Sequence, residues 1–209
     1  MTRRSLASVG AAAVLFLGLV LIAMHAIQPA LNPATHYVSE YAHGQFGWLV
    51  MVAYVAAGVG VLGIAWSAGT TLSGTRSVAL AICLALVGVG LIALGVTRID
   101  LPAADGSVTS TASGMAHNLA GYVGLLGLIP GAFLVAATFR RDSRLSRAVL
   151  SAWIFAASIV IIFGVAVMSP SLDLIGVGQR IFLTTWLAWL IFVAFQLSSA
   201  KRPPSSIKD

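Results

Sequence analysis

The sequence has little charge of either sign. Charged residues make up 9% of its 209 positions, whereas a soluble domain carries about 25%. Hydrophobic residues make up 59%, and the mean hydropathy is +0.98. Too few polar side chains are present to cover a water-exposed surface, which excludes an ordinary soluble domain. We therefore expect an all-α membrane protein whose outer side chains face lipid.

Cysteine is nearly absent. The single cysteine, Cys83, lies within an apolar run, which excludes a disulfide framework and a zinc site built from several thiolates. The sequence also lacks a glycine-rich phosphate loop, a GxSxG elbow and a CxxCH haem attachment. These absences exclude the common nucleotide, serine-hydrolase and c-type haem sites. They leave the cofactor unknown.

Six apolar runs are long enough to cross a bilayer, which needs about 20 residues in a helix. They cover approximately residues 8–27, 48–66, 78–96, 119–139, 148–168 and 181–197. We expect one transmembrane domain over residues 1–200 and a disordered cytoplasmic tail over 201–209. The first run has an alternative interpretation, because Arg3 and Arg4 precede it and the small residues near Ala26 resemble a signal-peptide cleavage site. Its length favours an uncleaved helix.

Lysine and arginine are distributed unequally between the two sides of these runs. Ten fall on the side of both termini, and only Arg98 and Arg180 fall on the other side. Cytoplasmic segments are the ones enriched in lysine and arginine. We therefore predict three helical hairpins in the cell membrane, with both termini cytoplasmic. The net charge of +6 is explained by this distribution, and it does not indicate a nucleic-acid partner.

Glycines recur along several runs at spacings that allow close helix contacts. They include Gly58 in the second run and Gly88 in the third. Gly127 and Gly131 in the fourth form a GxxxG pair. This concentration predicts that the fourth helix is central in the bundle.

Polar chemistry is concentrated in the segments that the charge distribution places outside. Residues 97–118 include Arg98, Asp100, Asp105 and His117 in an otherwise apolar chain. All four histidines fall on this side: His25, His36, His43 and His117. Ionisable groups at a membrane boundary need partners or water. We therefore expect the polar groups near the helix ends to converge in one pocket.

Individual roles follow from residue chemistry. Arg180 is expected to pair with Asp100 or Glu40, because guanidinium groups bind carboxylates well. His117 is expected to lie near a carboxylate. The predicted ligand-binding residues are Ser39, Glu40, Tyr41, His43, Asp100, His117, Gln179 and Arg180. No pair of histidines closely spaced on one helix indicates a metal site, and none is predicted.

Two functional interpretations remain open. In the first, the polar cluster binds a lipid head group or another small ligand, or it locks the helices together without binding anything. In the second, the protein is a membrane-embedded hydrolase or transferase, with or without a metal ion, acting at the outer face. Its catalytic candidates are His117, Asp100 and Glu40. Membrane lipids are the expected partners in both cases, and the oligomeric state is left open.

Four motifs in order resemble the domain-of-unknown-function family numbered 998, a set of prokaryotic six-helix membrane proteins. They are SEYAHGQFGW before the second run, TRIDLP after the third, GMAHNLAG at the fourth and GVGQR at the sixth. The resemblance implies a six-helix membrane fold and no particular activity. The positions matching the family pattern are Ser39, Glu40, Tyr41, Asp100, His117, Gln179 and Arg180.

The outer Ser, Asp and His residues are also similar to those of a second group, the superfamily of membrane hydrolases that includes alkaline ceramidases. That group holds zinc with three histidines, two of them on one helix, and this sequence lacks the helical pair.

Overall fold

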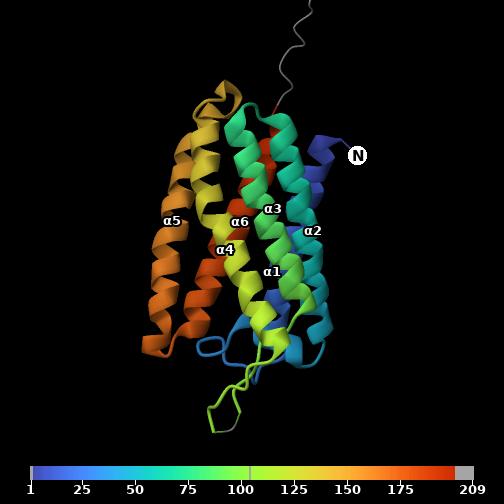
Figure 1. Cartoon of the computed structure of the whole chain (residues 1–209), viewed down its shortest axis with the longest axis vertical. Coiled ribbons are helices and arrows are strands. Elements are labelled where there is room, and N and C mark those ends of the chain that lie inside the picture. The colour runs from blue at the N-terminus through green and yellow to red at the C-terminus, as the bar shows by residue number, and fades with distance from the viewer. Residues whose placement is uncertain (1, 104, 201–209) are drawn as a thin grey trace, which may run out of the picture.

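The computed structural model describes residues 2–103 and 105–200, and the predicted tail at 201–209 lies outside these residues. Within them, all regular secondary structure is helical (Figure 1). The long helices are α1 (Arg3–Ile27), α2 (Gly47–Thr71), α3 (Thr75–Val96), α4 (Ala112–Phe139), α5 (Val149–Met168) and α6 (Ile175–Ser199). Short 3₁₀ helices, η1 (Val38–His43), η2 (Ser143–Ala148) and η3 (Ser169–Leu172), lie in the connections.

The six helices form a bundle in which consecutive helices pack side by side and α6 closes the ring against α1. Each is long and apolar enough to cross a membrane, which confirms the predicted six-helix, multi-pass class. The start of α1 and the end of α6 lie at one end of the bundle, at the top of Figure 1. We call this the basic end. The opposite end carries residues 28–46, 97–103, 105–111 and 169–174, and we call it the loop end.

Helices α4 and α6 begin well before the apolar runs that predicted them, so His117 and Arg180 lie inside helices rather than at their starts. Thr111 caps α4, because its side-chain oxygen accepts a hydrogen bond from the Gly114 N–H at 3.0 Å. The first turn of α6 is held by the Ala34 carbonyl, which accepts from the Gly176 N–H at 2.9 Å. Neither feature is apolar, so a hydropathy pattern does not detect it.

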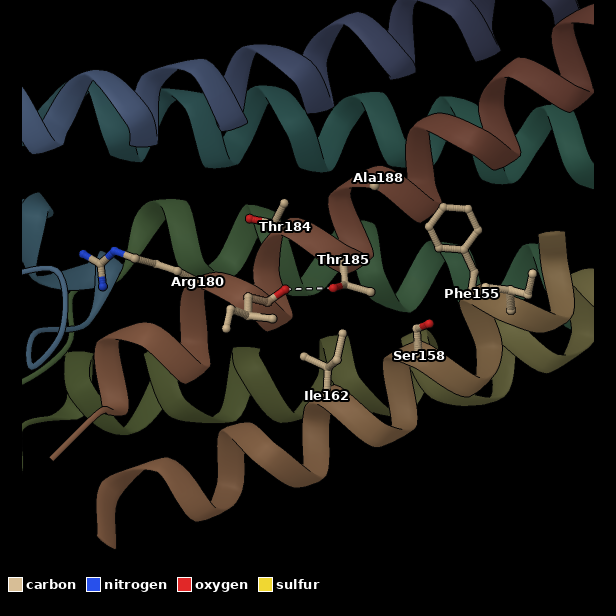
Figure 2. A pocket seen from close by; sticks show the side chains of 9 residues that line it. Phe155, Ser158, Ile162, Arg180, Thr184, Thr185 and Ala188 are labelled. Atoms are coloured by element: carbon tan, nitrogen blue, oxygen red, sulfur yellow. Dashed lines mark hydrogen bonds between the residues drawn. The ribbon is translucent and has the colours of Figure 1, made fainter. Parts of the chain in front are cut away.

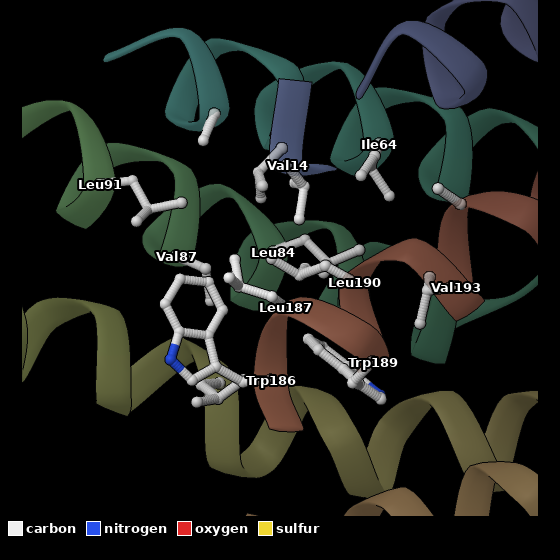
Figure 3. Close-up of a cluster of buried hydrophobic side chains, with 14 of the residues drawn as sticks. Val14, Ile64, Leu84, Val87, Leu91, Trp186, Leu187, Trp189, Leu190 and Val193 are labelled. Atoms are coloured by element: carbon white, nitrogen blue, oxygen red, sulfur yellow. The ribbon is translucent and has the colours of Figure 1, made fainter. Parts of the chain in front are cut away.

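The prediction that the fourth helix is central is wrong. Helix α4 packs along α3 and α5, whereas α2 and α6 make contact across the ring and are the most buried helices. The centre is filled by apolar side chains of α6, including the fully buried Trp189 and Leu190 (Figure 3). Glycine brings α4 close to this core, since a Cβ added at Gly131 would lie 3.6 Å from the Trp189 ring.

The glycines of the second and third runs do mark a helix contact, as predicted. A Cβ added at Gly58 would lie 2.6 Å from the Gly88 carbonyl oxygen, and one added at Gly88 would lie 2.9 Å from the Gly58 carbonyl oxygen. The backbones of α2 and α3 therefore approach too closely here for any larger residue, as in other membrane helix pairs built on small residues.

Candidate functional site

Asp100 holds the segment before α4 against the start of that helix. Its two carboxylate oxygens accept hydrogen bonds from the Thr111 N–H at 2.9 Å and from the Thr111 hydroxyl at 2.6 Å. These bonds, the side-chain bond first, hold the pKa of Asp100 below its ordinary value. Gly114 lies directly against the carboxylate, where a larger residue would collide with it. Asp100 is therefore an ionised group fixed at the loop end.

His117 lies almost one and a half turns after the start of α4 and is only 8% exposed. Its Nδ1 is 3.3 Å from the Thr97 carbonyl oxygen and 3.5 Å from the Thr97 hydroxyl oxygen. The Thr97 hydroxyl donates its own hydrogen to the Ala93 carbonyl at 2.6 Å, so it acts only as an acceptor toward the ring. Nδ1 therefore carries the proton, and Nε2 is left as an acceptor. The expected carboxylate partner is not among the ring's hydrogen-bond partners.

A cavity of about 680 Å³ lies beside these two residues, between α3, α4, α5, α6 and η1. Its polar lining is at the loop end: Tyr37, Ser39, Asp100, Ser110, His117, Asn118 and Gln179. Its deeper walls are apolar and include Leu91, Leu128 and Phe182. Trp186 lies there too, opposite Val87 and Leu91 of α3 (Figure 3). The cavity is thus amphipathic along its length.

The cavity opens sideways toward the lipid-facing surface. Tyr122 on α4 is 64% exposed and Val167 on α5 is 57% exposed, and both also line the cavity. At the same level Gly121 and Gly124 of α4 have no atom within 4 Å of an added Cβ. Helix α4 therefore leaves open space toward α5 and α6 in the loop-end half of the bundle, although Gly131 contacts Trp189 further along.

Arg180 belongs to a separate cluster. Its guanidinium donates from Nε to His25 Nε2 at 2.9 Å, from Nη1 to the His36 and Gly176 carbonyls at 2.7 and 3.0 Å, and from Nη2 to the Tyr41 hydroxyl at 3.1 Å. The predicted ion pair with Asp100 or Glu40 is not formed. Neutral acceptors surround the guanidinium instead, and they join α6 to α1 and η1.

The other expected residues have local partners. Glu40 accepts from the Tyr37 N–H at 2.8 Å and so caps η1. The His43 ring donates from Nε2 to the Ile99 carbonyl at 2.8 Å, which ties η1 to the segment before α4. Gln179 Oε1 accepts from the Val38 N–H at 2.7 Å. These bonds position η1 over the end of the bundle.

The cavity brings together Ser39, Asp100, His117 and Gln179 from the expected set. It does not include Glu40, Tyr41, His43 or Arg180. Sequence reasoning missed two structural residues, His25, which accepts from Arg180, and Gln28. The Gln28 amide is buried and donates to the Tyr41 and Gln45 carbonyls, both at 2.9 Å. A polar residue directly after an apolar run is the signal for Gln28, but its partners are backbone groups that a sequence pattern does not reveal.

A second hollow, of about 530 Å³, lies between α5 and α6 (Figure 2). It is lined by apolar side chains with Ser158, Thr184 and Thr185, and the Thr185 hydroxyl donates to the Ile181 carbonyl at 2.8 Å. Figure 2 shows the Arg180 guanidinium directed away from Thr184 and Thr185. Arg180 is the charged residue in its described lining, and this hollow has none of the carboxylate and amide groups that line the first cavity.

The fold and the amphipathic cavity define a six-helix, multi-pass membrane protein. A family model matches residues 10–196, so the chain belongs to the family described as protein of unknown function (DUF998). No match is found among the curated proteins or the solved structures. Among residues 2–103 and 105–200, no group of three or more His, Cys, Asp or Glu side chains is arranged to hold a metal ion.

Proposed function

We propose that this protein binds a membrane lipid in the cavity between α3, α4, α5 and α6. The observation that carries the proposal is the cavity's polarity, with an aspartate, a histidine and two amides at the loop end and apolar walls beyond them. A lipid has the same arrangement. Its head group would lie beside Asp100 and His117, and its acyl chains would enter through the side opening near Tyr122. The volume of about 680 Å³ falls within the usual range of about 300–1,000 Å³ for ligand sites.

The geometry supports binding better than the hydrolase or transferase alternative. The Asp100 carboxylate already accepts two hydrogen bonds from Thr111, and Glu40 caps η1 outside the cavity. These are structural tasks of a kind that helix caps commonly perform. His117, the remaining catalytic candidate, lines the cavity, but its hydrogen-bond partner is Thr97 and not a carboxylate. His117 therefore lacks the bonded carboxylate that orients the histidine of a catalytic triad.

The test fills the cavity without disturbing the helix contacts. Gly124→Leu places an isobutyl group where an added Cβ meets no atom within 4 Å, and leucine favours a helix more than glycine does. Gly164→Leu is the matched control, because Gly164 on α5 also has open space around it but does not line the cavity. Purified, delipidated protein would be incubated with dioleoylphosphatidylethanolamine, and bound lipid would be counted by native mass spectrometry.

We expect Gly124→Leu to weaken binding about tenfold or more. The leucine displaces about two methylene groups of the ligand, each worth about 0.8 kcal/mol, and 1.4 kcal/mol corresponds to a factor of ten. Gly164→Leu should bind as the wild type does. Equal lipid retention by all three proteins would show that the bound lipid lies outside the cavity, and would overturn the proposal.

A further inference from the structure

The charges around the cavity distinguish between lipid classes. Asp100 is the one aspartate or glutamate in its lining, and neither lysine nor arginine is present among the described lining residues. The nearest arginine in sequence, Arg98, is not part of the lining. Arg180 is held by His25, Tyr41 and two backbone carbonyls in the neighbouring cluster. The polar end of the cavity is therefore negative, and no lysine or arginine among the described residues lines it.

The hydrogen-bonding groups at this end can accept from a ligand. Asp100 is ionised at neutral pH, as an aspartate with its ordinary pKa is, and the bonds from Thr111 lower the pKa further. Each carboxylate oxygen keeps a further lone pair. His117 carries its proton on Nδ1, so the free Nε2 is an acceptor. The Gln179 amide oxygen is occupied by the Val38 N–H, which leaves its NH₂ group as a donor. Hydroxyl and ammonium groups fit such a lining, and a net negative head group does not.

Resting on the proposed lipid binding, we propose that the cavity selects lipids whose head groups carry hydroxyl or ammonium donors and no net negative charge. A hydroxyl group donates to the Asp100 carboxylate and accepts from the Gln179 amide. An ammonium group pairs with the carboxylate directly, as charge-assisted hydrogen bonds do. An anionic head group such as phosphatidylglycerol faces Asp100 with no cation in the lining to offset the repulsion.

The experiment compares three lipids with identical dioleoyl chains at pH 7.4: phosphatidylethanolamine, monoglucosyl diacylglycerol and phosphatidylglycerol. Each would be titrated into delipidated wild-type protein, with bound lipid counted by native mass spectrometry. We expect phosphatidylglycerol to bind about fivefold more weakly or worse than the preferred neutral lipid, the effect of unit charges about 4 Å apart in a wet environment. The comparison of phosphatidylethanolamine with monoglucosyl diacylglycerol, neither of which has a net charge, shows whether the cavity prefers an ammonium or a hydroxyl head group.

Asp100→Asn should bring phosphatidylglycerol close to the neutral lipids. Asp105→Asn is the control, since this exposed aspartate lies in the same segment and bonds to Ser107 outside the cavity. The comparison of the three lipids uses wild-type protein alone, so it tests the charge selectivity even if Asp100→Asn weakens the start of α4. If phosphatidylglycerol binds the wild type as tightly as both neutral lipids, and Gly124→Leu abolishes all three, the charge inference is wrong while lipid binding stands. If Gly124→Leu changes none of the three, lipid binding in the cavity fails, and the charge inference fails with it.

Discussion

At the scale of single residues, Arg180 has the densest set of partners at the loop end. Four side-chain hydrogen bonds reach α1, η1 and its own helix, and its guanidinium also lies 5.8 Å from the centre of the Tyr41 ring. The two bonds of the His25 ring indicate which of its nitrogens carries the hydrogen. Nδ1 of His25 donates to the Leu21 carbonyl at 2.7 Å, so Nε2 is the acceptor for Arg180. Arg180 thus joins three elements without a counter-charge.

Arg180→Ala should destabilise the protein by about 1–3 kcal/mol, because it removes these bonds and leaves partly buried acceptors unsatisfied. The measurement is the free energy of unfolding in detergent, obtained by titrating the protein with denaturant and recording the loss of its helical signal. Arg98→Ala is the matched control, since Arg98 is exposed and its hydrogen bonds are made by its backbone. Equal stability of the two variants would contradict a linking role for Arg180.

The difference between expected and observed partners has a physical reason. The sequence places Arg180 at nearly the same depth in the membrane as Asp100 and Glu40. Pairing of these opposite charges is then the simplest prediction. The structure satisfies each group with neutral partners instead, and many of these partners are backbone groups. Asp100 and Glu40 accept N–H groups at helix starts, and Arg180 donates to carbonyls. Backbone partners depend on chain path, which residue types alone do not specify.

At the scale of helices, the lipid environment made the fold predictable. A helix that crosses a bilayer must be apolar over a set length, so six helices could be identified from hydropathy. Their polar first turns could not. The start of α4 depends on Asp100 bonding to Thr111, eleven positions later, and the start of α6 depends on Ala34. The cavity was equally hidden, because it arises where α4 stands apart from α5 and α6.

The α2–α3 contact gives a prediction at this scale. Gly58→Val places methyl groups against the Gly88 carbonyl and Ile92, where even a Cβ would be only 2.6 Å from its neighbours. We expect a loss of about 1–3 kcal/mol in the free energy of unfolding, the usual cost of overpacking. Gly164→Val, in open space on α5, should lose much less. A Gly58→Val protein as stable as the Gly164→Val protein would mean that α2 and α3 separate freely.

At the scale of the whole molecule, the arginines at the basic end divide into two groups. Arg3 and Arg144 donate to the Thr70 and Thr71 carbonyls at the end of α2, and Arg4 donates to the Ala200 carbonyl at 2.9 Å. Cations at helix carboxyl ends stabilise those ends. Others are exposed and make no side-chain hydrogen bond within the part of the chain that the structure describes: Arg76, Arg140, Arg141 and Arg147. The exposure of this second group supports the proposal that orientation in the membrane explains the unequal distribution.

That orientation can be tested with single cysteines in a Cys83→Ala background, since Cys83 is the only native cysteine. Asp105→Cys places a thiol in the exposed segment at the loop end, and Ser143→Cys places one in the connection between α4 and α5 at the basic end. With the termini cytoplasmic, a membrane-impermeant maleimide added to intact cells should label Asp105→Cys and spare Ser143→Cys. Permeabilised cells should show labelling of both. Labelling of Ser143→Cys alone in intact cells would invert the topology and place the lipid cavity in the cytoplasmic leaflet.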